Sequence, residues 1–364
     1  MSAYITSIGT ANPEHQVSQG DVLAFMVKAH QLNPQEADHL KLLYRATGIH
    51  SRYTVLEDYL RKEGFTFYPN SENMEPFPNT EERGGQFMLA ACDLSVAAVR
   101  DCLPEDFDMH TITHLIVVSC TGMYAPGLDI DLIYQLGLNK TIERTGINFM
   151  GCYAAFNALK TANAICLSQP GSKVLIVCTE LCSIHFQKEK TDDNLLANAL
   201  FGDGSAAVLV ESEPGEKTAF KINGFMCDLL PDGQDEMAWK IGNFGFEMKL
   251  SSYVPGIIKD GIQQLLVRLR DSYQNLDFHH YIIHPGGKKI LQVIEEQLDI
   301  TKEQNQSAHH VLRHFGNMSS PTVLFVLKEL SGRIVASDDE KSILGLAFGP
   351  GLTLESMTLE VAYK

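Results

Sequence analysis

The segment Ile147-Asn-Phe-Met-Gly-Cys-Tyr-Ala-Ala-Phe-Asn-Ala-Leu-Lys160 joins a short apolar run to a stretch rich in alanine, with a glycine and a cysteine between them. Ile147 to Met150 is expected to form a short strand, and Tyr153 to Ala164 a helix. Gly151 can take backbone angles that other residues avoid, as a sharp turn between the two requires. The segment therefore predicts Cys152 at the N-terminus of a helix.

Cys152 is a candidate nucleophile because of this position. The helix macrodipole and the free amide groups of a helix N-terminus favour a thiolate. The same N–H groups can bind a developing oxyanion. The alternative interpretation is a small buried side chain beside a tight turn. A nucleophile needs polar partners, and these have to come from elsewhere in the chain.

Strand-like and helix-like segments alternate along the chain. Leu115-Ile-Val-Val-Ser119 and Val174-Leu-Ile-Val-Cys178 have the apolar character of buried strands. Phe87 to Arg100 and Cys152 to Leu167 place small and apolar residues at helical spacing. This alternation predicts an α/β fold with a covered sheet.

Composition narrows the function classes. The chain has 364 residues, 45% hydrophobic and 20% charged, which is typical of a soluble globular protein with one large α/β fold or two domains. The net charge of −16 argues against nucleic-acid binding and against attraction to an anionic membrane. No apolar run approaches the roughly 18 residues of a membrane span, and the N-terminus does not resemble a signal peptide, so a cytoplasmic location is expected.

The eight cysteines contain no Cys-x-x-Cys pair. In a chain of this length this pattern favours reduced thiols over a disulfide framework, with most of them small core residues. Two histidine pairs, His280 with His284 and His310 with His314, have spacings that put them on one face of a strand or helix, but neither includes the glutamate of the HExxH motif. We expect no metal site.

Two similar motifs that lie far apart in the chain indicate two similar halves. Phe201-Gly-Asp-Gly-Ser-Ala-Ala-Val-Leu-Val210 is a glycine turn that leads into an apolar strand, and Phe348-Gly-Pro-Gly-Leu-Thr-Leu-Glu355 repeats the form near the C-terminus. The polar, turn-rich segment 211–218 is the expected linker between the halves.

Two segments in the second half offer partners for Cys152. Tyr281-Ile-Ile-His-Pro-Gly-Gly287 is a short apolar strand that ends in His284, a possible proton shuttle or thiolate partner. His314-Phe-Gly-Asn-Met-Ser-Ser320 leads into an apolar helix from about Thr322 to Leu330. Taken alone, His284 is better explained as a hydrogen-bonded strand-end histidine, and Asn317 as a helix cap.

Together these motifs resemble the type III polyketide synthases, the chalcone- and stilbene-synthase-like branch of the thiolase superfamily. The resemblance rests on Gly-Cys152 before a helix, His284-Pro-Gly-Gly, Gly-Asn317-Met-Ser-Ser and the two phenylalanine–glycine turns, in family order from about Tyr4 onward. It implies a thiolase-like five-layered αβαβα fold made of two duplicated halves, usually assembled as a homodimer. Residues 1–215 would carry the nucleophilic cysteine, and residues 216–364 the histidine and asparagine.

The resemblance also implies roles for three residues. Cys152 would take the acyl group of an acyl-CoA starter as a thioester, with His284 stabilising its thiolate. His284 and Asn317 would hydrogen-bond the thioester carbonyl of malonyl-CoA, where negative charge grows as CO2 leaves. The substrates would be CoA thioesters, with no cofactor and no metal. Glu180 is expected to be a buried family carboxylate with a structural role.

The expected substrate pocket departs from that of the plant members. Phe201 matches one of two family gatekeeper phenylalanines, whereas Met248 stands at the second, and methionine is flexible enough to yield to a long chain. Trp239, the only tryptophan, stands near a small residue of the plant enzymes, and His185 replaces a threonine. With Ser319, these residues are the predicted pocket. They favour fatty acyl starters and alkylpyrone or alkylresorcinol products over a coumaroyl starter.

The sequence gives a weaker prediction of the residues that bind the CoA part of the substrate. The basic CoA-binding residues of plant members fall between His39 and Ala46, where only Lys41 and Arg45 are basic and both are displaced. Lys288 can meet a phosphate. An acyl carrier protein therefore remains an alternative to CoA. Two other functions stay open: a single-condensation ketosynthase that uses carrier-bound chains, and a catalytically silent acyl-binding protein on the same fold.

Overall fold

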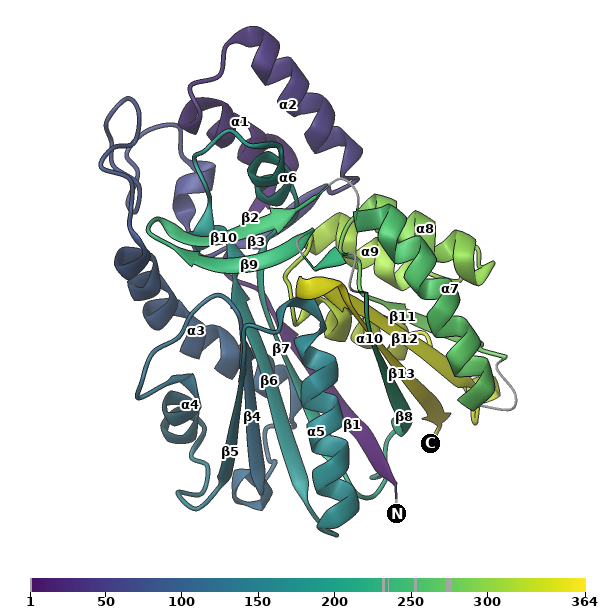
Figure 1. The fold of residues 1–364 in the computed structure, drawn as a ribbon. Helices are drawn as coiled ribbons and strands as arrows, with labels where there is room; N and C mark the ends of the chain where they lie inside the picture. The colour runs from purple at the N-terminus through teal and green to yellow at the C-terminus, as the bar shows by residue number, and fades with distance from the viewer. Residues whose placement is uncertain (1, 231–232, 235, 252–253, 273–276) are drawn as a thin grey trace.

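The computed structural model describes residues 2–230, 233–234, 236–251, 254–272 and 277–364, and its centre is a long mixed β-sheet (Figure 1). The sheet runs through both parts of the chain. In the order in which they lie side by side, its strands are β11 (His280–Ile283), β12 (Ser342–Gly349), β13 (Thr353–Ala362), β8 (Ala219–Leu229), β1 (Ala3–Ala11), β7 (Asp203–Glu211), β6 (Lys173–Leu181), β4 (His114–Ser119) and β5 (Glu143–Asn148).

The strand pairing repeats from one half to the other. In the first half β1 is antiparallel to β7, β7 is antiparallel to β6, and β6 is parallel to β4. In the second half β8, β13, β12 and β11 pair in the same sequence of directions. The halves meet where Ala3–Ile5 of β1 pairs with Phe220–Ile222 of β8. The duplicated α/β fold expected from the sequence is therefore confirmed.

Helices form the other layers (Figure 1). The outer face of the first half is covered by α3 (Thr80–Cys102), which contacts β1, β7 and β6, and by α4 (Leu128–Leu136), which packs on α3. Between the halves lie α5 (Ala154–Ser168), which contacts β6 and β13, and α10 (Thr322–Ser331), which contacts β1, β7 and β11. On the far side α7 (Val254–Ser272) packs on β8 and against α8 (Lys288–Leu298).

The long helix α3 illustrates how sequence sets these elements. Asn79 caps its N-terminus and Glu82 returns the bond, a capping box that satisfies two otherwise free backbone donors. Glu81 and Glu82 complement the positive end of the helix dipole, and Arg100 lies in its last turn. Small and apolar side chains on one stripe of the helix, including Phe87, are buried against the sheet.

Smaller elements gather at one end of the sheet, at the top in Figure 1. They are two hairpins and several helices. The hairpins are β2 (His15–Ser18) with β3 (Ser51–Thr54) and β9 (Met237–Gly242) with β10 (Gly245–Leu250). The α-helices are α1 (Gln19–Ala29), α2 (Pro34–Ala46), α6 (Asp192–Leu200) and α9 (Gln306–Phe315). Among the described residues, short 3-10 helices are η1 (Glu57–Leu60), η2 (Met109–Thr111), η3 (Gly151–Tyr153), η4 (Cys182–His185), η6 (Ala336–Asp338) and η7 (Pro350–Leu352).

Most of the predicted elements are confirmed. The two predicted strands lie within β4 and β6, and the predicted helices correspond to α3, η3 with α5, and α10. One boundary was wrong: the strand expected over Ile147–Met150 is β5, which ends at Asn148. Phe149 has a φ of +57° and Met150 is already in a helical conformation, so the chain leaves the sheet earlier than its apolar residues suggested.

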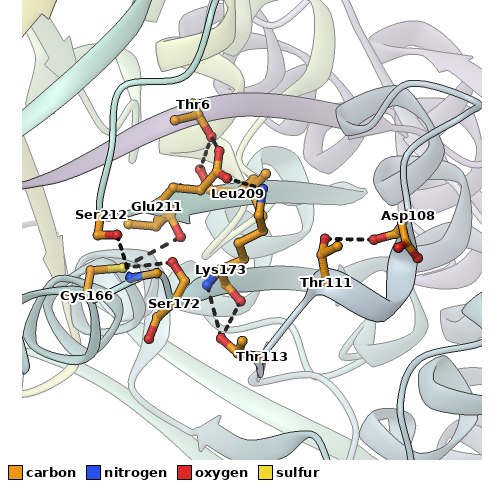
Figure 2. A network of polar contacts seen from close by, with 12 residues as sticks. Thr6, Asp108, Thr111, Thr113, Cys166, Ser172, Lys173, Leu209, Glu211 and Ser212 are labelled. Atoms are coloured by element: carbon orange, nitrogen blue, oxygen red, sulfur yellow. Dashed lines mark hydrogen bonds and ion pairs between the residues drawn. The ribbon is translucent and has the colours of Figure 1, made fainter. Parts of the chain in front are cut away.

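The cysteines are free thiols in this structure, and six of the eight are buried, while Cys92 is intermediate and Cys227 exposed. Cys166 is an example of a core cysteine away from any cavity (Figure 2). Its Sγ faces the carbonyl oxygens of Ser172 and Val210 at 3.9 and 3.7 Å. Nearby, Lys173 pairs with Glu211 at 2.6 Å, which ties β6 to β7. Within the described ranges no helix is long and apolar enough to cross a membrane.

Candidate active site

The turn that carries Cys152 depends on a glycine. Gly151 has a φ of +77°, and a Cβ at this position would lie only 2.2 Å from Cδ of Pro350. The Gly151 N–H donates to the Sγ of Cys120 at 3.1 Å. Cys152 follows in η3, directly before α5, and is 7% exposed. The loop around Pro350 in the second half therefore packs against the turn that carries Cys152 in the first half, and only glycine fits at position 151.

Asn317 is held at the boundary between the halves by its backbone. Its N–H donates to the carbonyl of Leu200 at 2.9 Å, and its carbonyl accepts from Gly202 at 2.9 Å, which forms an isolated bridge to Phe201. Its Oδ1 accepts from the Ser319 N–H at 2.8 Å. The N-cap of α10 is Pro321, so Asn317 is not the helix cap that the sequence allowed.

The Asn317 side chain faces Cys152. The Cys152 Sγ lies 3.9 Å from Oδ1 and 4.0 Å from Nδ2 of Asn317. Nδ2 also donates to the Gly286 carbonyl at 3.4 Å. Cys152 and Asn317 are 165 positions apart in the chain but face each other in the fold. The side-chain amide of Asn317 is a donor that can turn toward a substrate.

His284 follows β11 directly and lines the same cavity. Its backbone N–H donates to Leu346 at 2.8 Å, which continues the pairing with β12. The residue is 1% exposed, and neither ring nitrogen has a hydrogen-bond partner among the described residues. A histidine with a merely structural role would be hydrogen-bonded, so these free nitrogens point to a group that is held ready for a ligand.

One pocket joins the three residues, and its empty space of about 610 Å³ includes its opening to solvent. Four of the five predicted pocket residues line it as well. His185 is the exception, because it lines a neighbouring chamber. The lining residues are Cys120, Thr121, Gly151, Cys152, Cys182, Phe201, Met237, Trp239, Met248, Leu250, His284, Gly286, Ile290, Asn317, Ser319, Phe348 and Pro350.

Burial sets the charge state of the resting site. It raises the pKa of the Cys152 thiol to about 12, against a smaller opposing effect of its hydrogen bond with Ser319. It lowers the pKa of His284 to about 3. Near pH 7 the thiol is therefore protonated and the imidazole neutral. The resemblance led us to expect a thiolate stabilised by His284, whereas burial favours the neutral form of both groups in the unliganded protein.

Glu180 ties both halves together behind the cavity. One carboxylate oxygen accepts from Ser320 Oγ at 2.6 Å, and the other accepts from Thr121 Oγ1 and the Cys120 N–H, both at 2.8 Å. The residue is fully buried, and burial raises its pKa. Because Ser320 precedes α10 and Cys120 faces the Gly151 turn, this carboxylate fixes the two segments that carry Asn317 and Cys152.

An open pocket of about 750 Å³ leads toward the cavity between α2, α6 and α8. It shares Leu250, Gly286 and Ile290 with the cavity. Lys288 lines this mouth, and its contact with a phosphate stays a prediction. Lys41 and Arg45 do not line it, because they lie on the exposed side of α2, where Leu43 and Ala46 face the pocket instead.

Sequence reasoning missed several residues of the cavity. Cys120 and Cys182 follow buried strands and were taken only as small core cysteines, although both line the cavity. Pro350 lay inside the quoted Phe348-Gly-Pro-Gly motif, which was a usable signal. The His310 and His314 rings lie 4.7 Å apart on α9, away from the cavity. In the part of the chain that the structure describes, no three His, Cys, Asp or Glu side chains form a group that could hold a metal.

Comparison with known families matches nearly the whole chain. The family described as chalcone and stilbene synthases matches through its N-terminal domain over residues 1–214 and through its C-terminal domain over residues 221–362. A Bacillus subtilis (strain 168) protein named "Putative chalcone synthase" is 31% identical over 97% of this chain and 97% of its own length.

Other relatives come from a slime mould and a brown alga. "Probable polyketide synthase 1" of Dictyostelium discoideum is 30% identical over 99% of this chain, which spans only 11% of that protein. The crystal structure of the C-terminal type III polyketide synthase domain of Steely1, a type I/III hybrid from Dictyostelium, has a TM-score of 0.89 at 28% identity, over 99% of both chains. The structure of PKS-I from Ectocarpus siliculosus has a TM-score of 0.90 at 27% identity, over 99% of this chain and 98% of that one.

Proposed function

The chain belongs to the chalcone and stilbene synthase family of type III polyketide synthases, and from this premise we propose that it extends an acyl-CoA starter on Cys152 by decarboxylative condensation with malonyl-CoA. One observation carries the proposal. Cys152, His284 and Asn317 come from opposite halves of the fold and line one buried cavity, with Cys152 Sγ 3.9 Å from Asn317 Oδ1.

Loading begins from the neutral pair. As Cys152 Sγ attacks the starter carbonyl, its proton passes to a free nitrogen of His284, and a thioester forms. The same proton then goes to the sulfur of the departing CoA. His284 suits this role because it is neutral near pH 7 and neither ring nitrogen is occupied by the described residues.

Decarboxylation uses the groups of the second half. Loss of CO2 from malonyl-CoA leaves an enolate, whose negative charge falls on the thioester oxygen. Asn317 Nδ2 and the N–H of neutral His284, both in this cavity, would hydrogen-bond that oxygen. Fixed donors in a water-poor cavity stabilise this charge more than they stabilise the ground state. The carbanion then attacks the Cys152 thioester, so the acyl chain grows by two carbons and the thiolate is released.

Fatty acyl starters, with alkylpyrones or alkylresorcinols as products, are the substrate and product classes that we propose. Apolar side chains dominate the cavity wall, and Met248 occupies a gatekeeper position where an unbranched side chain can change rotamer. Trp239 fills space that a small residue leaves open in plant relatives, which disfavours an aromatic starter there. Lys288 is a lining cation of the mouth, a support for CoA delivery over carrier-protein delivery.

A homodimer formed along the edge strand β5 also belongs to this proposal. β5 pairs with β4 alone among the described strands, and most of its residues are exposed. Met123 and Tyr134 are exposed. Met123 lines an open surface pocket together with residues of β5, and Tyr134 lies on α4. An open edge flanked by apolar side chains is expected to pair with another chain. Light scattering on the purified protein should give twice the mass of the chain, and a strictly monomeric species would overturn this part.

Product analysis tests the function directly. Purified protein is incubated with malonyl-CoA and starters from acetyl-CoA to palmitoyl-CoA, with p-coumaroyl-CoA and benzoyl-CoA included. Mass spectrometry then measures the masses of the products. Pyrone or resorcinol masses from fatty starters are expected. Preference for the aromatic starters would overturn the substrate class, and acylated Cys152 without any product would favour a carrier-dependent ketosynthase.

A further inference from the structure

Cys120 is a buried thiol of the catalytic cavity that the proposed mechanism does not use. It directly follows β4, is 2% exposed and lines the cavity together with Cys152. Its sulfur accepts a hydrogen bond from the Gly151 N–H at 3.1 Å, and Gly151 immediately precedes Cys152 in the chain. One cysteine of the cavity is therefore bonded to the turn that carries another.

The turn from Phe149 to Gly151 forms a concave arrangement of backbone N–H groups. Phe149 and Gly151 have left-handed φ values of +57° and +77°, and Met150 between them is right-handed helical. Successive N–H groups in alternating conformations of this kind converge on one point and favour an acceptor there. The Cys120 sulfur is that acceptor, because the Phe149 N–H also contributes a hydrogen bond to it, smaller than that of Gly151. Without the sulfur, the Gly151 N–H would be buried and unpaired.

The backbone of Cys120 is fixed on both sides. Its N–H donates to Oε2 of Glu180 at 2.8 Å, and its carbonyl accepts from Nε1 of Trp239 at 2.7 Å. Glu180 is in turn bonded to Ser320 at 2.6 Å, on the segment that leads into α10. A residue that is held by both of its backbone groups carries its side chain in a defined direction. Cys120 therefore offers the turn a rigid acceptor.

The chemistry of Cys120 suits an acceptor better than a second nucleophile. Burial raises the pKa of its thiol well above the ordinary value, and the Glu180 carboxylate acts in the same direction. The group is therefore a neutral thiol near pH 7, whose sulfur keeps lone pairs for N–H donors. That sulfur is engaged by the turn, whereas the Cys152 sulfur faces the Asn317 side chain. The place of Cys120 in the cavity therefore indicates support of the site.

We propose that Cys120 is a positioning residue: its sulfur, by accepting from the Gly151 N–H, holds the turn that aims Cys152 at the starter carbonyl. This inference rests on the proposed function, because loading of Cys152 is the step that it serves. Pro350 packs against Gly151 from the second half, and Cys120 holds it from the first. A reacting atom that is displaced by about 1 Å can react about a hundredfold more slowly, so one hydrogen bond at this turn can control loading.

The test measures two reactions of the same cavity in Cys120→Ala, which removes the acceptor. Loading of Cys152 with decanoyl-CoA, followed by intact-protein mass spectrometry, should slow by about tenfold to a hundredfold at saturating starter. The starter concentration that gives half the maximal loading rate should stay within about threefold. Malonyl-CoA decarboxylation should also stay within about threefold, because His284 and Asn317 are unchanged. A general loss of structure would lower both reactions, so equal losses would overturn the positioning role.

Two further variants separate the acceptor from the volume of the side chain. Cys120→Ser keeps an acceptor at the turn and should recover loading to within about fivefold of the wild-type rate. Cys178→Ala removes another wholly buried thiol, in β6 and outside the cavity lining, and leaves a similar void. This matched control should load within about twofold of the wild-type rate. A serine variant that loads no better than alanine, or an equal loss in Cys178→Ala, would contradict the proposal.

Amide hydrogen exchange tests the anchoring of the turn without any catalysis. In Cys120→Ala, exchange in a peptide that covers residues 147–153 should accelerate by about fivefold at the Phe149 and Gly151 amides, the range of one lost hydrogen bond. The same peptide should be unchanged in Cys178→Ala. Unchanged exchange in Cys120→Ala means that the proposal fails, even where pyrones are made. If exchange accelerates as expected but the wild-type protein loads no starter, the proposed function fails and the anchoring of the turn stands.

Discussion

The two halves of the fold connect equivalent strands in different ways. In the first half, β6 and β7 are joined by η4, α6 and the Phe201-Gly turn. In the second half, β12 and β13 are joined only by the short η7 around Pro350. The strands on either side pair in the same directions, so the difference lies entirely in the connections.

In the proposed function the long connection contributes to substrate selection, and the short connection fixes the turn that carries Cys152. Residues between β6 and β7 supply Phe201, the proposed gatekeeper, part of the mouth and much of the neighbouring pocket that His185 lines. The short turn supplies Pro350, which packs against Gly151 and fixes the Cys152 turn. The matching middle helices differ as well, since α5 begins beside Cys152, the proposed nucleophile, and α10 begins beside the segment that carries Asn317. In the proposed mechanism each copy of the duplicated scaffold carries a separate part of the chemistry.

The largest expected effect comes from removing the nucleophile of the first half. Cys152→Ala should abolish acyl loading, because no other thiol of the cavity follows the Gly151 turn into a helix N-terminus. Intact-protein mass spectrometry after incubation with decanoyl-CoA checks this, with Cys227→Ala as a control at an exposed cysteine. An acyl adduct on the Cys152→Ala protein at the wild-type level would mean that Cys120 or Cys182 is the nucleophile.

The charge state of the site gives the next largest effect. Burial raises the pKa of Cys152 to about 12, so the thiolate fraction should rise about tenfold with each pH unit well below that value. Alkylation of Cys152 by iodoacetamide, followed by peptide mass spectrometry, should therefore accelerate about a thousandfold from pH 6 to pH 9. A rate that is already high at pH 6 and flat to pH 8 would show that His284 is an imidazolium paired with a thiolate, against its lowered pKa.

The polar groups of the second half are tested by Asn317→Ala. Loss of one donor to the enolate oxygen should lower malonyl-CoA decarboxylation by about a hundred- to a thousandfold. Loading of decanoyl-CoA on Cys152 should persist, since the thiol and His284 are unchanged. The released CO2 and the intact protein mass report the two steps separately. Equal loss of both steps would indicate that Asn317 mainly supports the fold through its backbone bridge to Phe201.

The smallest effect concerns the contact between the halves. Gly151 and Gly171 both have a positive φ, of +77° and +81°, so alanine meets a similar backbone penalty at each. Only at Gly151 does the new Cβ collide with Pro350, whereas nothing lies within 4 Å at Gly171. Gly151→Ala should therefore lower the free energy of unfolding by about 1–3 kcal/mol more than Gly171→Ala. Denaturant unfolding of the two variants measures this, and equal losses would remove Pro350 as the cause.

Sequence predicted the parts of this molecule that local pattern controls. Apolar runs located β4, β6 and α3, and the repeated phenylalanine–glycine turns revealed the duplication. The three motifs around Cys152, His284 and Asn317 could be recognised because each combines a special residue with a glycine or proline that the backbone needs.

Other features depend on contacts between distant segments and left no local signal. The neutral state of His284 follows from its burial, which lowers the pKa of the imidazole. The placement of Lys41 and Arg45 away from the mouth depends on which face of α2 is buried, a choice that neighbouring helices make. The strand at Ile147 ended early because Phe149 adopts a left-handed conformation that its sequence does not announce.

The division of labour between the halves is tested most directly by malonyl-CoA decarboxylation in the Cys152→Ala protein, measured as CO2 release without any starter. His284 and Asn317 remain in place in that variant, so the account predicts decarboxylation within about threefold of the wild-type rate while loading is absent. A fall of a hundredfold or more would contradict the account, because it would show that the thiol of the first half takes part in the step assigned to the second.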